Sequence, residues 1–311
     1  MRVYRTFEEI EYKKETVLTV GTFDGVHIGH QLIIRNLLNN AKKNNWRPVL
    51  LTFNPHPQMV VQRENKKPIK LLTTIEERLE LFKKYGLSDV LIIPFSRSFS
   101  LTPPEEFVKK YLIEKIGMKK ILIGFDHMFG KDRGGNENLL SSMASIYNFE
   151  IEKIGPLLRG NEKVSSTKIR ENLEKYALDN VNEMLGYTYS VRGLVVKGDG
   201  RGRTIGLPTA NIKYDENKKV PEIGVYFVKS VIKGEIYYGL ANIGTRPTFT
   251  DELKTILEVH FIDFDKDVYG MDLKIEFIKF LRHEQKFSNV EMFLEQIEKD
   301  KIKALEMIKL F

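Results

Sequence analysis

Two histidines and three glycines in one short segment could carry out phosphate chemistry. The segment GTFDGVHIGH, Gly21 to His30, follows a β-rich run and leads into a helical one. Glycine lets a backbone approach a ligand closely, and the free amides at a helix N-terminus can bind phosphate. His27 and His30 are three residues apart, so both imidazoles face one side of the first turn and could donate to developing negative charge. The candidate nucleotide contacts beside these two catalytic candidates are Gly21, Phe23, Asp24 and Gly29.

A second candidate phosphate segment, VSSTKIR, ends at Arg170 and combines hydroxyl and basic side chains. Hydroxyls and a guanidinium at the start of a helix suit the triphosphate of a nucleotide. The same Ser-Ser-Thr string is also a good helix N-cap, and capping alone would explain it as an isolated string. The candidate nucleotide contacts here are Ser165, Ser166, Thr167 and Arg170.

These two segments together resemble the signatures of the nucleotidyltransferases, an α/β superfamily. The segments TFNPHP, residues 52 to 57, and GFDHMFGKDRGG, residues 124 to 135, narrow the resemblance to the FMN adenylyltransferase module of bacterial FAD synthetases. The resemblance implies that the phosphate of FMN attacks the α-phosphate of ATP near His27 and His30, which releases pyrophosphate and forms FAD.

The same resemblance assigns three further residues to ligand contacts. Asp126 is expected near the adenosine, and Asn54 and His56 are candidate flavin contacts. Turn formation beside Gly124 is the alternative for Asp126, and shaping of a proline-rich loop is the alternative for the other two. His127 stands where family members commonly carry an aromatic residue, which leaves its effect on ligand contacts open.

The second half of the chain contains a glycine- and arginine-rich loop that ends in PTAN. Its backbone amides and guanidinium groups could wrap nucleotide phosphates, although a solvated hairpin loop is the alternative. Thr209 and Asn211 lie two residues apart, so on a strand their oxygens project from the same face as two neutral ligands for Mg²⁺. The candidate kinase nucleotide contacts are Gly198, Gly200, Arg201, Gly202 and Arg203.

The PTAN segment resembles riboflavin kinases, and segments at 224–226, 242–249, 257–264, 268–270 and 281–287 match the same family in order. The resemblance implies that Glu258, paired with His260 in an ExH element, is the general base that activates riboflavin toward the γ-phosphate of ATP. A surface carboxylate is the alternative for Glu258. Arg246 and Arg282 are candidate flavin contacts, and loop salt bridges explain either arginine about as well.

The elements that must hold these residues follow from the hydrophobic pattern. Residues 16 to 154 alternate apolar β-rich runs with helical stretches, which predicts a Rossmann-like parallel sheet covered by helices. From residue 187 onward the short β-rich segments predict a small antiparallel barrel, closed by an amphipathic helix with Ser288 as its N-cap. We expect an adenylyltransferase domain over 1–182 and a kinase domain over 183–311.

Composition sets the remaining limits. The 311 residues contain no cysteine, which excludes disulfides and thiolate sites, and no signal-like or membrane-spanning apolar run is present, so we expect a cytoplasmic enzyme. The expected ligands are ATP, riboflavin, FMN, FAD, ADP and pyrophosphate, with no membrane and no nucleic acid. The net charge of +7 leaves a flavin-sensing nucleic-acid binder as one alternative, and activity in only one half is another. The oligomeric state stays open.

Overall fold

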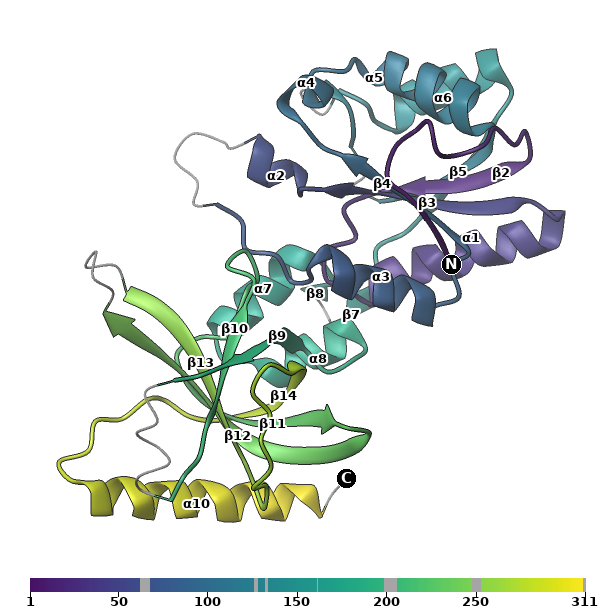
Figure 1. The fold of residues 1–311 in the computed structure, drawn as a ribbon. Coiled ribbons are helices and arrows are strands. Elements are labelled where there is room, and N and C mark those ends of the chain that lie inside the picture. The colour runs from purple at the N-terminus through teal and green to yellow at the C-terminus, as the bar shows by residue number, and fades with distance from the viewer. Residues whose placement is uncertain are drawn as a thin grey trace. The chain divides into compact units, whose positions relative to one another are not determined.

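The computed structural model of the chain describes residues 1–61, 68–125, 128–131, 134–160, 162–198, 206–247 and 253–309. It divides into two units, Met1–Ser166 and Thr167–Phe311. The predicted α/β unit and barrel unit are both confirmed (Figure 1). The predicted limits of the functional domains at residues 182 and 183 stay a prediction. Several expected site residues lie outside the described residues, namely Asp126, Gly200, Arg201, Gly202, Arg203 and the side chain of Arg246.

The first unit is built on a six-stranded sheet in which every described pair is parallel. Its spatial order is β1-β4-β3-β2-β5-β6. The strands are β1 (Arg2–Tyr4), β2 (Thr16–Val20), β3 (Arg47–Asn54), β4 (Asp89–Pro94), β5 (Met118–Gly124) and β6 (Glu150–Ile154). The short strands β7 (Leu158–Arg159) and β8 (Glu162–Lys163) form a separate pair.

Helices cover both faces of this sheet, and this explains why its strands read as continuous apolar runs. Successive side chains of a strand point to opposite faces, so in β2 Val17 packs into one core and Leu18 into the other. The helices are α1 (Ile28–Asn44), α2 (Pro57–Val60), α3 (Ile75–Lys84), α4 (Arg97–Ser100), α5 (Pro104–Glu106), the π-helix η1 (Phe107–Ile116) and α6 (Glu137–Tyr147). The turn between β2 and α1 follows the end of β2, so it lies at the carboxyl edge of the parallel sheet.

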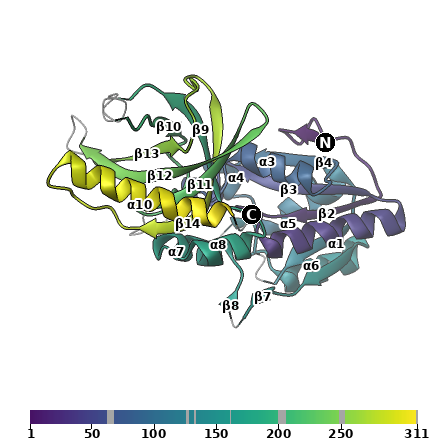
Figure 2. The ribbon, with the colours of Figure 1, turned by 90° about the horizontal axis from the view of Figure 1, so that it is seen from below.

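The second unit begins with two helices, α7 (Ser166–Glu174) and α8 (Leu178–Leu185), and continues into a closed antiparallel barrel (Figure 2). The order around the barrel is β10-β13-β12-β11-β14-β9. The strands are β9 (Ser190–Val196), β10 (Ala210–Tyr214), β11 (Gly224–Ile232), β12 (Glu235–Pro247), β13 (Leu253–Phe261) and β14 (Asp272–Arg282). None of the helices in the described ranges is long and apolar enough to cross a membrane.

The closing helix α10 (Val290–Ile308) packs against the barrel through Ala304 and its neighbours, which contact Phe227 and Leu240. The expected helix is confirmed, but its predicted N-cap is wrong. Asn289 caps the helix, because its Oδ1 accepts the backbone N–H of Met292 at 2.9 Å. The Ser288 hydroxyl instead donates to the sulfur of Met292 at 3.2 Å.

Candidate functional sites

The turn that carries the two histidines has a strained backbone. Phe23, Gly25 and Val26 have φ values of 49°, 81° and 35°, and the left-handed region is unusual for a β-branched residue such as valine. The surroundings hold this conformation in place. The Gly25 N–H donates to Thr73 Oγ1 at 2.9 Å, and the Val26 N–H donates to the Phe23 carbonyl at 3.0 Å. Strain maintained in this way is typical of functional sites.

The turn brings the two predicted catalytic histidines into direct contact. His27 is the N-cap of α1, and its Nδ1 accepts the backbone N–H of His30 at 3.3 Å. The two rings stack with centroids 3.6 Å apart and planes inclined by 16°. Gly29 leaves room for this stack, because a Cβ there would lie 3.2 Å from the His27 ring. Phe23 contacts the other side of the pair, with its ring centroid 5.1 Å from that of His30.

The environment of His30 favours a neutral imidazole. Burial is the main cause that lowers its pKa well below the ordinary value, and the neighbouring His27 and Arg78 act in the same direction. Its Nδ1 is buried and makes no hydrogen bond in the described structure. A neutral imidazole can still donate one N–H to an oxygen that becomes more negative during a reaction.

Asp24, a predicted nucleotide contact, organises the turn in this structure. Its carboxylate is 1% exposed and accepts the backbone N–H groups of Leu72 and Thr73 at 3.1 and 2.9 Å. The Asp24 carbonyl in turn accepts the Ser166 hydroxyl at 2.8 Å, which brings Ser166 to the histidine turn. Ser165 precedes this residue directly, and Thr167 and Arg170 follow it on α7.

The candidate flavin contacts at the end of β3 differ in exposure. Asn54 is exposed, whereas His56 is 5% exposed and caps α2 by accepting the Gln58 N–H at 3.2 Å. Aromatic rings that the sequence analysis did not single out lie next to them. Phe53 and Phe95, near the ends of β3 and β4, have ring centroids 5.5 Å apart. Both rings lie near the carboxyl ends of adjacent buried strands, where ligands bind in such sheets, and this sequence position could have marked them as candidates.

The barrel unit aligns the predicted base with the predicted metal ligand. Strand register places Glu258 of β13 directly opposite Asn211 of β10 on one side and Asn242 of β12 on the other. Residues directly opposite one another share a face of the sheet, so the three polar side chains form a row across three strands. Asn242 was quoted within a sequence segment but given no role. The pairing partner of the predicted base could not be read from the sequence.

Two glycines leave space for this polar row. A Cβ at Gly198 would lie 2.3 Å from the Asn211 amide nitrogen, so a larger residue there would displace the amide. A Cβ at Gly244 would lie 2.9 Å from Glu284 Oε1 and 3.4 Å from the Asn242 amide nitrogen. Glu284 therefore reaches the same neighbourhood, although the sequence assigned it no chemistry.

His260 lies two residues after Glu258 on the same strand face. Its Nδ1 lies 2.9 Å from the Pro208 carbonyl oxygen, next to Thr209. This contact joins the ExH element to the PTAN segment. The candidate base and both candidate metal ligands are therefore tied to one part of the barrel wall.

Arg282, a candidate flavin contact, forms an ion pair inside the unit. Its Nε donates to Asp300 Oδ2 of α10 at 2.8 Å, and the two side chains are 13% and 1% exposed. This contact matches the structural alternative for Arg282. Its expected flavin contact stays a prediction.

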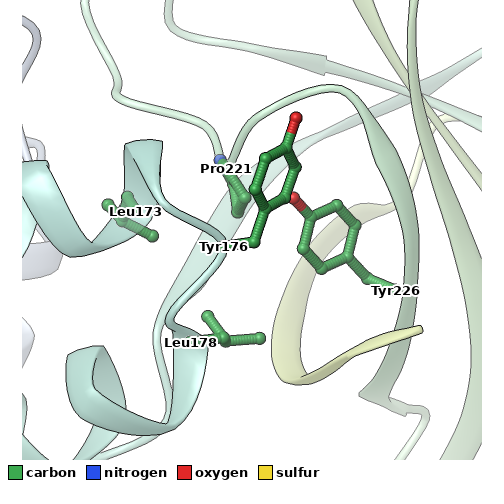
Figure 3. Close-up of a pocket in the computed structure, with 5 residues that line it drawn as sticks. All are labelled: Leu173, Tyr176, Leu178, Pro221 and Tyr226. Carbon is green, nitrogen blue, oxygen red and sulfur yellow. The ribbon is translucent and has the colours of Figure 1, made fainter. Parts of the chain in front are cut away.

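A small hollow elsewhere in the second unit is lined mainly by apolar side chains and by two tyrosine rings (Figure 3). The Tyr226 hydroxyl donates to the Glu222 carbonyl at 2.6 Å, and burial raises the pKa of this phenol. The lining contains no candidate catalytic residue. The residues are Leu173, Tyr176, Leu178, Pro221 and Tyr226.

Comparison with known proteins agrees with this division into two sites. Residues 9–168 match the family described as FAD synthetase, and residues 185–308 match the family described as riboflavin kinase. A bifunctional riboflavin kinase/FMN adenylyltransferase of Listeria monocytogenes is 37% identical over 284 residues, which cover 91% of this chain and 90% of that protein. The corresponding protein of Bacillus subtilis is 35% identical over 298 residues, with 95% and 93% covered.

A solved structure has the same fold over nearly the whole chain. It is described as a macrolide-efflux protein from Streptococcus pneumoniae, is 28% identical, and superposes with a TM-score of 0.87 over 97% of this chain and 98% of its own. Fold and sites together define a two-domain transferase, with one nucleotidyltransferase unit and one kinase barrel. The chain belongs to the bifunctional riboflavin kinase/FMN adenylyltransferase family of flavin cofactor biosynthesis.

Proposed function

We propose that the first unit transfers the adenylyl group of ATP to FMN at the turn between β2 and α1. The phosphate oxygen of FMN attacks the α-phosphorus of ATP, and the bond to the pyrophosphate oxygen breaks, so that FAD and pyrophosphate form. His27 and His30 donate N–H groups to the oxygens on which charge develops. Ser165, Ser166, Thr167 and Arg170 bind the departing phosphates. The stacked histidines on the rigid turn are the observation that supports these roles most strongly.

We further propose that the barrel phosphorylates riboflavin with Glu258 as the general base. The ribityl hydroxyl gives its proton to Glu258 as its oxygen attacks the γ-phosphorus of ATP, and ADP leaves. The loop from Gly198 to Arg203 contributes phosphate contacts. The observation that supports this proposal most strongly is the strand register that places Glu258 opposite Asn211.

The residues at this place fit Mg²⁺ bound together with ATP. The described residues contain no group of three or more His, Cys, Asp and Glu side chains that could hold a metal ion by themselves. Thr209 and Asn211 would hold the ion through neutral oxygens, and phosphate oxygens and water would supply its other ligands. The ion would neutralise charge on the phosphates. We propose the cytoplasm as the compartment and free ATP, riboflavin and FMN as the ligands.

Flavin chromatography of two variants tests these assignments. Purified protein is incubated with ATP and Mg²⁺, starting either from riboflavin or from FMN. We expect Glu258→Gln to convert FMN to FAD but to leave riboflavin unchanged. We expect His30→Ala to convert riboflavin to FMN and to stop there.

Each variant is the control for the other, because the two sites share one chain. FMN formation at the wild-type rate in Glu258→Gln would refute the base assignment. FAD formation at the wild-type rate in His30→Ala would refute the role of His30. RNA binding by the wild-type protein without any turnover of ATP would favour the nucleic-acid alternative.

A further inference from the structure

A fully buried arginine lies beneath the histidine turn. Arg78 belongs to α3, whose first turn is fixed by the capping box of Thr74 and Glu77. The spacing of Ile75, Arg78 and Phe82 places all three on the buried side of the helix. Arg78 is 0% exposed, so a charged side chain occupies a core position. Arginine is almost never fully buried unless it is paired.

The Arg78 guanidinium forms hydrogen bonds near the carboxyl ends of two central strands, β2 and β3. Its Nη1 donates to the Thr22 carbonyl at 2.7 Å and to Thr52 Oγ1 at 3.1 Å. The Thr52 hydroxyl donates to the same Thr22 carbonyl at 3.1 Å. Thr22 follows β2 and opens the turn that leads to His27, whereas Thr52 lies in β3. These hydrogen bonds therefore hold the backbone at Thr22, where the histidine turn begins.

The positive charge of Arg78 is not neutralised by an ion pair among the described residues. Its Nε and Nη2 are buried and make no hydrogen bond there. Asp24 and Glu76 are the carboxylates that favour its charged form, while burial opposes it and lowers its pKa. The Asp24 carboxylate accepts hydrogen bonds from the Leu72 and Thr73 backbone. The positive charge of Arg78 therefore acts on nearby groups through an interior in which little water screens it.

His30 is the group on which this field acts. It is flanked by the stacked ring of His27 and by the ring of Phe23. Burial is the main cause that lowers the pKa of His30, and the neighbouring His27 and Arg78 lower it further. A second proton on His30 would have to sit on the buried Nδ1, which has no hydrogen-bond acceptor in the described structure. The buried position of Nδ1 and the nearby positive charge thus both disfavour protonation of His30.

We propose that Arg78 is a positioning residue for adenylyl transfer: it fixes the start of the histidine turn, and its charge adds to burial in keeping His30 a neutral hydrogen-bond donor. This inference rests on the proposed role of His30. A neutral donor does not bind the ground-state phosphates as strongly as a cation would. Its hydrogen bond strengthens as charge develops in the transition state, and only such a difference accelerates the reaction.

Histidine ring NMR on the full-length protein tests the proposal. In the wild type we expect the His30 ring to stay neutral well below about pH 6.5, the ordinary midpoint. In Arg78→Met we expect the His30 midpoint to rise above the wild-type midpoint, because a positive neighbour is removed. FMN adenylylation by this variant should then lose kcat toward acidic pH at correspondingly higher pH than the wild type does.

Arg47→Met is the matched control. Arg47 is also buried, at 8% exposure, but it lies at the start of β3 and donates to Thr16 Oγ1 and the Ile116 carbonyl. The substitution removes a buried guanidinium that lies at the start of β3, whereas Arg78 contacts Thr52 near the end of that strand. We expect it to leave the His30 midpoint at the wild-type value.

Three outcomes would overturn the proposal. One is a wild-type His30 that is already cationic near neutral pH. A second is an unchanged midpoint in folded Arg78→Met. If that variant fails to fold, Arg78→Lys decides, since a midpoint raised despite the retained charge would refute the electrostatic role. Full activity of His30→Ala would instead refute the proposed role of His30, without altering what the spectra say about Arg78.

Discussion

The rings of His27 and His30 stack face to face at 3.6 Å, while Nδ1 of His27 accepts the backbone N–H of His30. Two imidazolium ions at this distance would repel each other, and burial adds a further penalty for charge on His30. The pair therefore contains at most one cation near neutral pH. A neutral tautomer of His27 that accepts at Nδ1 carries its proton on Nε2.

The first prediction concerns stability as a function of pH. The folded pKa of His30 lies well below its ordinary value of 6.5, so on acidification the unfolded chain binds a proton that the folded chain does not. This contribution to stability is fully present above about pH 6.5 and is lost as the pH falls toward the folded pKa, by at most about 1.4 kcal/mol per pH unit. Glutamine does not titrate, so we expect His30→Gln to lose less stability than the wild type as the pH falls.

Fluorescence of Trp46 gives the measurement for the first unit alone. It is the single tryptophan of the chain, and it packs against the core beside α1 and α3. Urea unfolding followed by this signal at a series of pH values gives the free energy of unfolding of that unit. Identical pH slopes for wild type and His30→Gln would contradict the prediction.

The second prediction is that Gly198→Ala impairs the kinase alone. The new Cβ would lie 2.3 Å from the Asn211 amide nitrogen, so that amide must move away from its place opposite Glu258. Displacement by about 1 Å can reduce a rate on the order of 10²-fold. FMN formation from riboflavin is the measurement, and FAD formation from FMN should be unaffected.

Gly234→Asn is the control for this prediction. Gly234 lies in the turn between β11 and β12, where a Cβ would meet no atom within 4 Å, and asparagine is enriched among the non-glycine residues that adopt a positive φ, here 88°. We expect this variant to keep kinase activity. Wild-type kinase activity in Gly198→Ala would mean that the position of Asn211 is unimportant for phosphoryl transfer.

Much of the architecture was accessible from sequence because it follows from local patterns. The apolar runs that became β2 through β5 show two-sided burial directly, and GTFDGVHIGH lies where a strand ends and a helix begins. The long closing helix was also predicted from its periodicity. These features depend on neighbours along the chain, whose spacing is visible in the sequence.

What was missed depends on residues far apart in the chain. Asn242 gains significance only because barrel register places it opposite Glu258. Arg78 reads as one charge among several on an amphipathic helix, and only its burial distinguishes it. In α10 the apolar Ile302 is 48% exposed, whereas Asp300 is buried. The partner of Asp300 is Arg282, which comes from another element. Periodicity does not specify such partners.

The third prediction concerns this pair of Arg282 and Asp300. Removing one partner leaves the other charge buried without compensation, which typically destabilises a protein by about 3–5 kcal/mol. We expect Asp300→Ala to lower the stability of the second unit by about this amount, measured by calorimetry. The control is Asp272→Ala, which breaks the exposed pair with Arg192, where the expected loss is about 0–1 kcal/mol. Equal effects of the two variants would contradict the prediction.

The fourth prediction separates a scaffold role of Asp24 from contact with the nucleotide. Asp24→Ala removes the carboxylate that accepts the backbone N–H groups of Leu72 and Thr73, and losing a hydrogen bond to a buried donor costs about 1–3 kcal/mol. We expect the Trp46 signal to report a large loss of stability. Glu9→Ala is the control, because Glu9 accepts the Arg5 N–H at an exposed position, where substitutions change stability by about 0.5 kcal/mol or less. If Asp24→Ala instead unfolded like the wild type but raised the KM for ATP, the carboxylate would have to contact the nucleotide directly.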